Sequence, residues 1–278
     1  MISTIVGNKF VIDSILGCGN FGIVYDGLKL NSLKEHVAIK LEPIDNTYKV
    51  LRHEVTILNY LHYNGVKYIP RIYWFGQHLN YTCLVMTHFT CSLQDYIIRK
   101  GILNQIKLSS MIIKCIDLLS SVHKSRVLHR DIKPHNFMIK DGDLYLIDFG
   151  LSNVFIDDYG EHTEKRDIDS IVGSPKYVSY YNHCSEPMSR RDDLISLGYM
   201  YMFMQKGQLP WDNTRRESPI SDISVLNPNN IFRMDKKSWI KIESILDGAI
   251  KMYMKYCYEL KYNDEPNYHI LMELFVNF

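Results

Sequence analysis

A polar loop within residues 127–139 carries side chains that could perform group-transfer chemistry. Asp131 can accept a proton, and Lys133 can neutralise a phosphate group. Asn136 and, further along the chain, Asp148 offer the hard oxygen ligands that suit Mg²⁺. A proton acceptor, a cation and two metal ligands are together what phosphoryl transfer requires.

Short apolar runs around this loop predict the strands that would hold it. Val127–Leu128 and Phe137–Ile139 border the loop, and Leu144–Ile147 forms a third run directly before Asp148. A plain polar turn between strands is the alternative interpretation. Chance is an unattractive explanation, because five such residues at this spacing should arise in roughly one of ten thousand chains of this length. The residues are His129, Arg130, Asp131, Lys133 and Asn136, followed downstream by Asp148-Phe149-Gly150.

A glycine-rich stretch near the start of the chain separates two β-rich runs, 10–16 and 23–25. Its residues are Gly17, Cys18, Gly19, Asn20, Phe21 and Gly22. Glycines would let the backbone of such a hairpin come close to phosphate groups. A dinucleotide-binding turn is disfavoured because a strand and not a helix follows, and a plain hairpin turn is the alternative. Val24 would cover an adenine ring or pack in the core.

A lysine ends the apolar run Val37–Lys40, although a lysine in a strand is usually a solvated charge. The amphipathic segment Tyr48–Leu61 predicts a helix that carries Glu54. From that helix Glu54 could hold the Lys40 ammonium group in place. Glu42 is nearer in the sequence but lies beside the strand, so Glu54 is the preferred partner.

The remaining periodicities predict an α+β protein with a sheet followed by helices. Two further strands are expected at Arg71–Gly76 and Tyr81–Met86, and they complete a five-stranded antiparallel sheet accompanied by one helix. From Ser92, an N-cap candidate, the pattern becomes helical, and 108–123 carries apolar residues at the spacing of a long buried helix. The helical part should form the larger half.

Composition limits the classes of partner. The 278 residues are 46% hydrophobic with a net charge of +1, so neither nucleic acid nor a membrane is an expected partner. Six cysteines without Cys-x-x-Cys spacing predict neither a zinc site nor a disulfide framework. The N-terminus shows no signal-like apolar core, and the apolar stretch 194–205 is too short to span a bilayer. We therefore expect a soluble intracellular protein, in the cytoplasm, the nucleus or both. A monomer is also expected, although no pattern in the sequence bears on oligomeric state.

The loop motif and Asp148-Phe149-Gly150 resemble the catalytic and magnesium-binding loops of eukaryotic protein kinases. The resemblance implies a bilobal fold with an N-lobe at 1–86, a hinge at 87–91 and a C-lobe at 92–278, and it implies ATP and Mg²⁺ as cofactors. Asp131 and Lys133 would be catalytic, and Asn136 and Asp148 would bind the metal. The implied nucleotide-binding residues are Gly17, Cys18, Gly19, Asn20, Phe21, Gly22, Val24, Ala38, Lys40, Glu54, Met86, Thr87, His88 and Phe89. Ordinary core packing is the alternative for Met86.

Nearly the whole chain resembles the casein kinase 1 family of serine/threonine kinases. Lys133 two residues after Asp131 is the serine/threonine version of the loop, and the run 189–199 contains Ser-Arg-Arg-Asp-Asp-Leu-x-Ser-Leu-Gly. The segments 173–183 and 256–268 extend the similarity. The resemblance implies a non-specific protein kinase that phosphorylates serine and threonine hydroxyls of protein substrates. A preference for acidic or pre-phosphorylated substrates is a hypothesis.

Departures from that family concern substrate recognition. Ser179-Tyr180-Tyr181 replaces a Ser-Ile-Asn element, and His135 stands where aspartate is usual. Lys176 matches one basic residue of the family's phosphate pocket, where arginine is usual. A second basic partner is not identified; Arg215 and Arg216 are candidates, with solvated loop arginines as the preferred interpretation.

Several neighbouring residues are expected to organise the site. Asp193 should bind the backbone of the His129–Arg130 turn, with a helix-start charge as the alternative. His129 is interpreted as structural, and Ser174 is expected to contact Asp131 and Lys133. The family resemblance implies activity without phosphorylation in the segment that carries Thr163 and Ser170.

Two other classes stay open: a pseudokinase scaffold, which should lack a catalytic residue, and a small-molecule phosphotransferase, which should lack a peptide-docking segment such as 173–183.

Overall fold

The computed structural model describes residues 5–19, 22–101, 103–157, 159–163, 168–212 and 223–276. The predicted sites at Asn20, Phe21, Arg215 and Arg216 lie outside the described residues, as does the Cys18 side chain. The chain divides into two compact units, Met1–Cys91 with Met138–Gly150 and Ser92–Phe137 with Leu151–Phe278. The predicted boundary assigned 138–150 to the second lobe, whereas these residues pack with the first unit.

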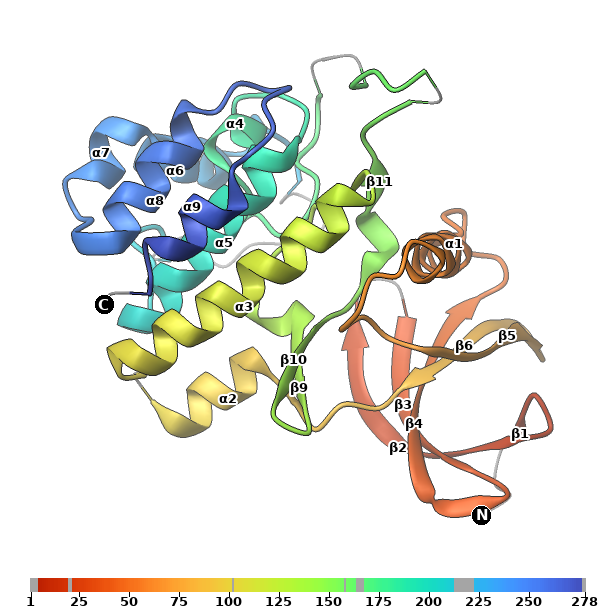
Figure 1. Cartoon of the computed structure of the whole chain (residues 1–278). Helices are drawn as coiled ribbons and strands as arrows, with labels where there is room; N and C mark the ends of the chain where they lie inside the picture. Colours follow the sequence, from red (N-terminus) through yellow and green to blue (C-terminus); the bar gives the residue numbers. More distant parts are fainter. Residues whose placement is uncertain are drawn as a thin grey trace. The chain divides into compact units, whose positions relative to one another are not determined.

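The first unit contains a six-stranded antiparallel sheet in the order β1-β2-β3-β4-β6-β5 (Figure 1). Its strands are β1 (Ile5–Val6), β2 (Phe10–Gly19), β3 (Gly22–Lys29), β4 (Ser32–Pro43), β5 (Ile72–His78) and β6 (Tyr81–Thr87). The sheet has one strand more than the five predicted, because Ile5 and Val6 pair with β2 at its edge. A two-residue strand is too short to show the alternation by which strands are recognised.

The two faces of this sheet have separate cores. One face buries Val6, Phe10, Val37, Ile39, Leu41, Cys83 and Val85. The other buries Ala38, Leu84 and Met86 against Leu51 and Val55 of helix α1 (Val50–Tyr63). Alternate residues of a strand point to opposite faces, so the Ala38 face also carries Lys40. The predicted helix at Tyr48–Leu61 is confirmed with a shift of two residues at each end.

The rest of the first unit is a short hairpin of β9 (Phe137–Lys140) and β10 (Asp143–Leu146). It belongs to a three-stranded sheet of order β10-β9-β7, in which β7 is Cys91–Ser92. The Thr90 N–H donates to the Ile139 carbonyl at 3.0 Å, and the Leu146 N–H donates to Tyr68 at 3.0 Å. These bonds hold the strand that leads to Asp148 within the first unit.

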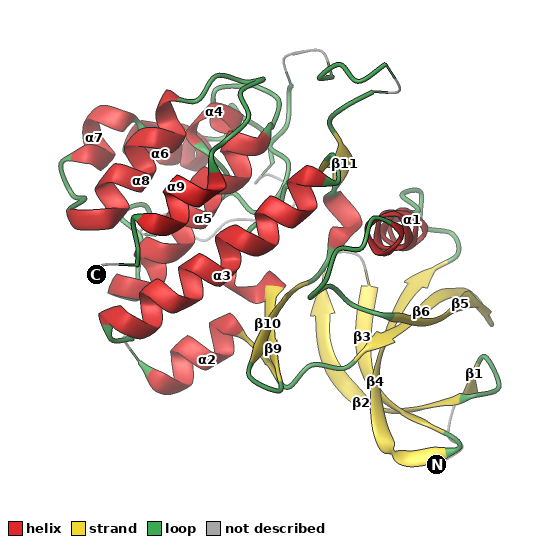
Figure 2. Cartoon of the chain, viewed as in Figure 1, coloured by secondary structure: helices red, strands yellow, loops and turns green. Residues whose placement is uncertain are grey.

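The second unit is mainly helical (Figure 2). Its helices are α2 (Leu93–Lys100), α3 (Gln105–Lys124), α4 (Tyr180–His183), α5 (Arg190–Lys206), α6 (Pro228–Lys237), α7 (Trp239–Glu243), α8 (Gly248–Glu259) and α9 (Tyr268–Glu273). Short 3₁₀ turns are η1 (Pro134–Asn136) and η2 (Phe149–Leu151), and β8 (Val127–Leu128) pairs with β11 (Asn153–Val154).

Helix α5 forms the centre of the second unit. Its side chains are buried from Arg191 to Met204, and it contacts both α3 and α8. A helix buried all round needs no amphipathic stripe. The predicted long helix at 108–123 lies within α3, and Ser92 caps α2 through a reciprocal bond pair with Asp95, as predicted. Among the described residues, no helix is both long and apolar enough to cross a bilayer.

Candidate active site

Lys40, Glu54 and Asp148 meet in the first unit. The Lys40 Nζ donates to Glu54 Oε2 at 2.8 Å and to Asp148 Oδ1 at 2.9 Å. The predicted Lys40–Glu54 contact is therefore confirmed. Glu54 is fully buried on α1, and Lys40 is nearly so on β4. The ammonium group is therefore fixed between Glu54 on α1 and Asp148, which lies shortly after β10.

Electrostatics in this cluster follow from burial. Burial alone would lower the pKa of Lys40, but the carboxylates of Glu54 and Asp148 outweigh it and raise that pKa. Lys40 is therefore charged at neutral pH. Burial raises the pKa of Glu54, while Lys40 and the Phe149 backbone oppose this rise. The other nearby acid, Glu42, instead accepts from the backbone N–H groups of Val50 and Leu51 and so caps α1.

The sheet face that carries Lys40 also carries the residues predicted to contact adenine. Ala38 pairs with Met86 across β4 and β6, and Val24 packs against the same cluster. Met86 is 6% exposed and belongs to this core, as the alternative interpretation of ordinary core packing predicted. The face thus presents a small apolar surface next to a fixed ammonium group.

The glycines of the β2–β3 hairpin have different structural reasons. Gly17 pairs with Val24, Cys18 with Ile23 and Gly19 with Gly22. A Cβ at Gly22 would lie 2.0 Å from the Leu41 carbonyl oxygen, and the φ of Gly22 is +146°, so this position excludes other residues. A Cβ at Gly17 would meet no atom within 4 Å. The fold itself therefore requires Gly22 and tolerates a side chain at Gly17.

Thr87 at the end of β6 and His88 after it offer a nucleotide fewer free backbone groups than the sequence suggested. The Thr87 N–H donates to the Arg71 carbonyl at 3.0 Å, and the Thr87 Oγ1 accepts from the Arg71 N–H at 2.9 Å. The His88 carbonyl accepts from Lys140 Nζ at 3.2 Å. Burial lowers the pKa of the His88 imidazole, and the Asp26 carboxylate opposes this shift. The Thr87 N–H is thus already used in a hydrogen bond within the protein. Sequence spacing could not reveal this bond.

In the second unit, the Asp131 carboxylate is held by three side chains. Oδ2 accepts from Lys133 Nζ at 2.7 Å and from Asn136 Nδ2 at 3.1 Å. Oδ1 accepts from the Ser174 N–H at 3.0 Å and from its hydroxyl at 2.8 Å. Lys133 also donates to Ser174 Oγ at 3.0 Å, so the predicted contacts of Ser174 are confirmed. Asp131 has a fixed orientation and a cation at hydrogen-bond distance.

Asp193 on α5 anchors the turn before Asp131. Its carboxylate accepts from the backbone N–H groups of His129 at 2.8 Å and Arg130 at 2.9 Å, as predicted. It also accepts from His123 Nε2 at 3.0 Å. Burial would raise the pKa of Asp193, but these hydrogen bonds and charges hold it below its usual range. Arg130 has a backbone φ of +67°. This conformation is costly for a residue with a side chain, so the turn needs such an anchor.

His129 is fully buried, and its Nδ1 accepts from the Asp131 N–H at 3.3 Å. This contact supports the structural interpretation of His129.

The loop that carries Ser174 is fixed from two sides. A Cβ at Gly173 would lie 2.3 Å from the Arg130 carbonyl oxygen, so the loop passes directly over the His129–Arg130 turn. The buried Lys237 on α6 donates to the carbonyls of Pro175 at 3.0 Å and Val178 at 2.6 Å, and it contacts His183 Nε2 at 3.1 Å. Sequence reasoning missed Lys237, because a lysine at the end of an exposed-looking helix gives no signal of burial.

Asn136 in the second unit and Asp148 in the first each present an oxygen of the kind that binds magnesium. The Asn136 Nδ2 donates to the Asp131 carbonyl at 2.8 Å as well as to its carboxylate, so the amide oxygen is the group left to bind a cation. Asp148 has a φ of +66° at the end of its strand, and its side chain is 28% exposed. An amide oxygen and a carboxylate are hard ligands of the kind that Mg²⁺ prefers.

Lys176, the predicted phosphate-binding lysine, is paired in the protein. Its Nζ lies 2.9 Å from Asp212 Oδ2 and 4.5 Å from the centre of the Phe203 ring. An incoming phosphate would have to compete with Asp212.

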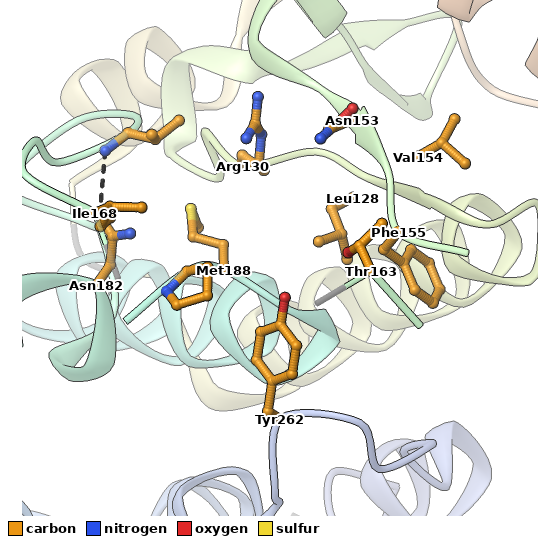
Figure 3. Close-up of a pocket in the computed structure, with 12 residues that line it drawn as sticks. Leu128, Arg130, Asn153, Val154, Phe155, Thr163, Ile168, Asn182, Met188 and Tyr262 are labelled. Carbon is orange, nitrogen blue, oxygen red and sulfur yellow. Dashed lines mark hydrogen bonds between the residues drawn. The ribbon is translucent and has the colours of Figure 1, made fainter. Parts of the chain in front are cut away.

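A separate cavity of about 220 Å³ lies in the second unit, and Arg130, Thr163 and Tyr262 are among its lining residues (Figure 3). The Arg130 Nε donates to the Leu151 carbonyl at 2.6 Å. The cavity therefore adjoins the His129–Arg130 turn and the segment that carries Thr163.

One family model matches this chain. The family model described as the protein kinase domain matches residues 10–273, which is nearly the whole chain. The chain therefore belongs to the protein kinase family and is a phosphotransferase that acts on proteins. The antiparallel sheet with one helix and the helical second unit agree with the bilobal kinase fold. Membership implies the use of ATP and, typically, Mg²⁺.

Proposed function

We propose that this protein kinase transfers the γ-phosphoryl group of ATP to serine and threonine hydroxyls, with substrate recognition of the casein kinase 1 type. The observation that carries the proposal is the Asp131 carboxylate held between Lys133 and Ser174 at 2.7 and 2.8 Å. A lysine beside the carboxylate supplies positive charge where the phosphoryl group would be attacked. The intact set Lys40, Asp131, Asn136 and Asp148 disfavours a scaffold without activity.

The reaction is proposed to depend on placement and electrostatics. Asp131 accepts the proton of the substrate hydroxyl, and its double contact with Ser174 orients the carboxylate for this step. Lys133 offsets the negative charge that develops on the transferred group. Lys40 holds the α- and β-phosphates, because Glu54 keeps its ammonium group at one position.

The nucleotide is proposed to lie against the sheet face of Val24, Ala38 and Met86. Among the hinge residues, His88 and Phe89 are the proposed backbone partners of adenine, since the Thr87 N–H already donates to Arg71. Of the glycine-rich stretch, Gly17 and Gly19 are proposed to approach the phosphates. Asn136 and Asp148 would hold Mg²⁺, which when bound neutralises phosphate charge.

We further propose that activity does not require phosphorylation of Thr163 or Ser170. The support is that Ser174 already contacts Asp131 and Lys133, while Lys237 fixes the following loop without any added group. These contacts already order the loop, so no added phosphate charge is needed for that purpose. Activity that begins only after Thr163 or Ser170 is phosphorylated would contradict this part of the proposal.

A set of peptides tests the substrate class. Purified protein is incubated with Mg²⁺, labelled ATP and matched peptides that differ only in serine, threonine or tyrosine at one position. Labelling of the serine and threonine peptides and not of the tyrosine peptide is expected, and preferential labelling of tyrosine would overturn the proposal.

Acidic and pre-phosphorylated versions of the serine peptide test recognition. Lys176→Ala is expected to reduce the ratio of primed to unprimed labelling, and an unchanged ratio would remove Lys176 from substrate recognition. A small-molecule phosphotransferase would label none of the peptides.

A further inference from the structure

Three metal-ligating side chains from neighbouring strands converge in the first unit, on residues that the kinase reaction does not use for chemistry. They are Asp26 on β3, His36 on β4 and His88 just after β6. One ligand atom of each lies within 4.8 Å of the other two. The strand order β3-β4-β6 makes these three strands adjacent.

The sheet register explains why the side chains meet. Asp26 pairs with Ala38, and His36 precedes Ala38 by two residues, so Asp26 and His36 share one face as diagonal neighbours. Val37 pairs with Thr87, which brings His36 opposite His88 one step further along the ladder. The ring centres of His36 and His88 lie 5.4 Å apart.

The distances suit a small ion after a modest contraction. His36 Nδ1 lies 2.9 Å from Asp26 Oδ1, and His88 Nε2 lies 3.7 Å from the same oxygen. Ligand atoms of a tetrahedral zinc site lie about 3.3 Å apart, because each lies about 2.0–2.2 Å from the metal. These two separations lie on either side of this value, and the ring nitrogens of His36 and His88 lie within 4.8 Å of each other.

Burial provides both a fixed base and an entry path. The side chain of Asp26 is 14% exposed and that of His88 is 24% exposed, whereas His36 is 49% exposed. Asp26 is held on β3 and His88 follows β6 directly, and solvent reaches the cluster beside His36. Lys140 further fixes the backbone at His88 through its bond to the carbonyl.

We propose that Asp26, His36 and His88 bind one divalent transition-metal ion of the zinc type. Two imidazoles and one carboxylate are a ligand set that such ions prefer, whereas Mg²⁺ prefers oxygen ligands and water. Three protein ligands leave a fourth position for water. The site is thus distinct in its chemistry from the magnesium ligands Asn136 and Asp148.

The test measures Zn²⁺ binding to the full chain, without an affinity tag and without nucleotide, by competition with a chromophoric chelator. We expect one Zn²⁺ per chain, retained in millimolar Mg²⁺. His36→Gln should weaken binding at least about tenfold, since even the loss of a residue that only supports a ligand costs about 10–100-fold. Asp26→Asn serves as a second variant, and thermal unfolding in chelator shows that each variant is folded.

A matched control is available in the second unit. His269 lies 3.5 Å from Glu273 and is exposed, but among the described residues no second histidine joins this histidine–carboxylate pair. His269→Gln should leave Zn²⁺ affinity unchanged. Equal binding by wild type and His36→Gln, displacement by Mg²⁺, or no stoichiometric binding to wild type would overturn the proposal. None of these readouts depends on kinase activity, so they are independent of the proposed function.

Discussion

Two glycines of the β2–β3 hairpin should respond in opposite ways to the same substitution. In Gly22→Ala the new Cβ would lie 2.0 Å from the Leu41 carbonyl oxygen, at a φ of +146°. Backbone strain of about 1–3 kcal/mol and overpacking of about 1–3 kcal/mol predict a loss of roughly 2–6 kcal/mol in the free energy of unfolding. At about 2–4 °C per kcal/mol, Tm should fall by roughly 4–24 °C.

Gly17→Ala provides the contrast within the same hairpin. Its new Cβ would meet no atom within 4 Å, so we expect a Tm equal to or slightly above that of the wild type. If phosphates approach the backbone at Gly17, the methyl group should instead raise the KM for ATP, by about tenfold for a lost interaction of roughly 1.4 kcal/mol.

Thermal unfolding and the ATP dependence of peptide phosphorylation, measured on both variants, separate these effects. Equal losses of Tm in the two variants would refute the described hairpin geometry. An unchanged KM for ATP in Gly17→Ala would refute a phosphate contact at that glycine.

Three further predictions concern buried titratable groups. Glu54→Gln should lower kcat/KM by up to about 100-fold because Lys40 loses its fixed position, whereas Glu42→Gln should cost about 0.5–2 kcal/mol of stability through the α1 cap and retain activity; unfolding and kinetics on both variants check this. Burial beside Lys237 lowers the pKa of His183 to about 2, so between pH 6.5 and 2 the unfolded chain binds a proton that the folded chain does not. The free energy of unfolding should therefore fall by about 1.4 kcal/mol per pH unit below pH 6.5. Measured from pH 7 to 5, this fall should be larger in the wild type than in His183→Gln. Lys237→Met should cost about 2–5 kcal/mol because the buried Val178 carbonyl and the partly buried Pro175 carbonyl lose their donor, and an unchanged Tm would contradict that role.

Chemistry confined to one loop was predictable from the sequence. Asp131, Lys133 and Asn136 lie within six residues of one another, so the chain itself keeps them close. Lys40 and Glu54 are 14 residues apart, and their contact was predictable because helical periodicity gave α1 a buried face.

Features that depend on tertiary register were not predictable. The Asp26, His36 and His88 cluster exists only because three strands pair in one register, which no local pattern reveals. The commitment of the Thr87 N–H depends on Arg71, which lies 16 residues away in the sequence. Burial of Lys237 likewise follows from the packing of α6 against the Ser174 loop.

Phosphorylation of a serine peptide by wild type and by Asp131→Asn tests the central claim most directly, with ATP binding to both proteins measured alongside. The substitution keeps the shape of the side chain and removes its ability to accept a proton. We predict equal ATP affinity and a fall of about 10²–10⁴-fold in kcat, the range that a positioned general base contributes. Phosphorylation by Asp131→Asn at the wild-type rate would contradict the account.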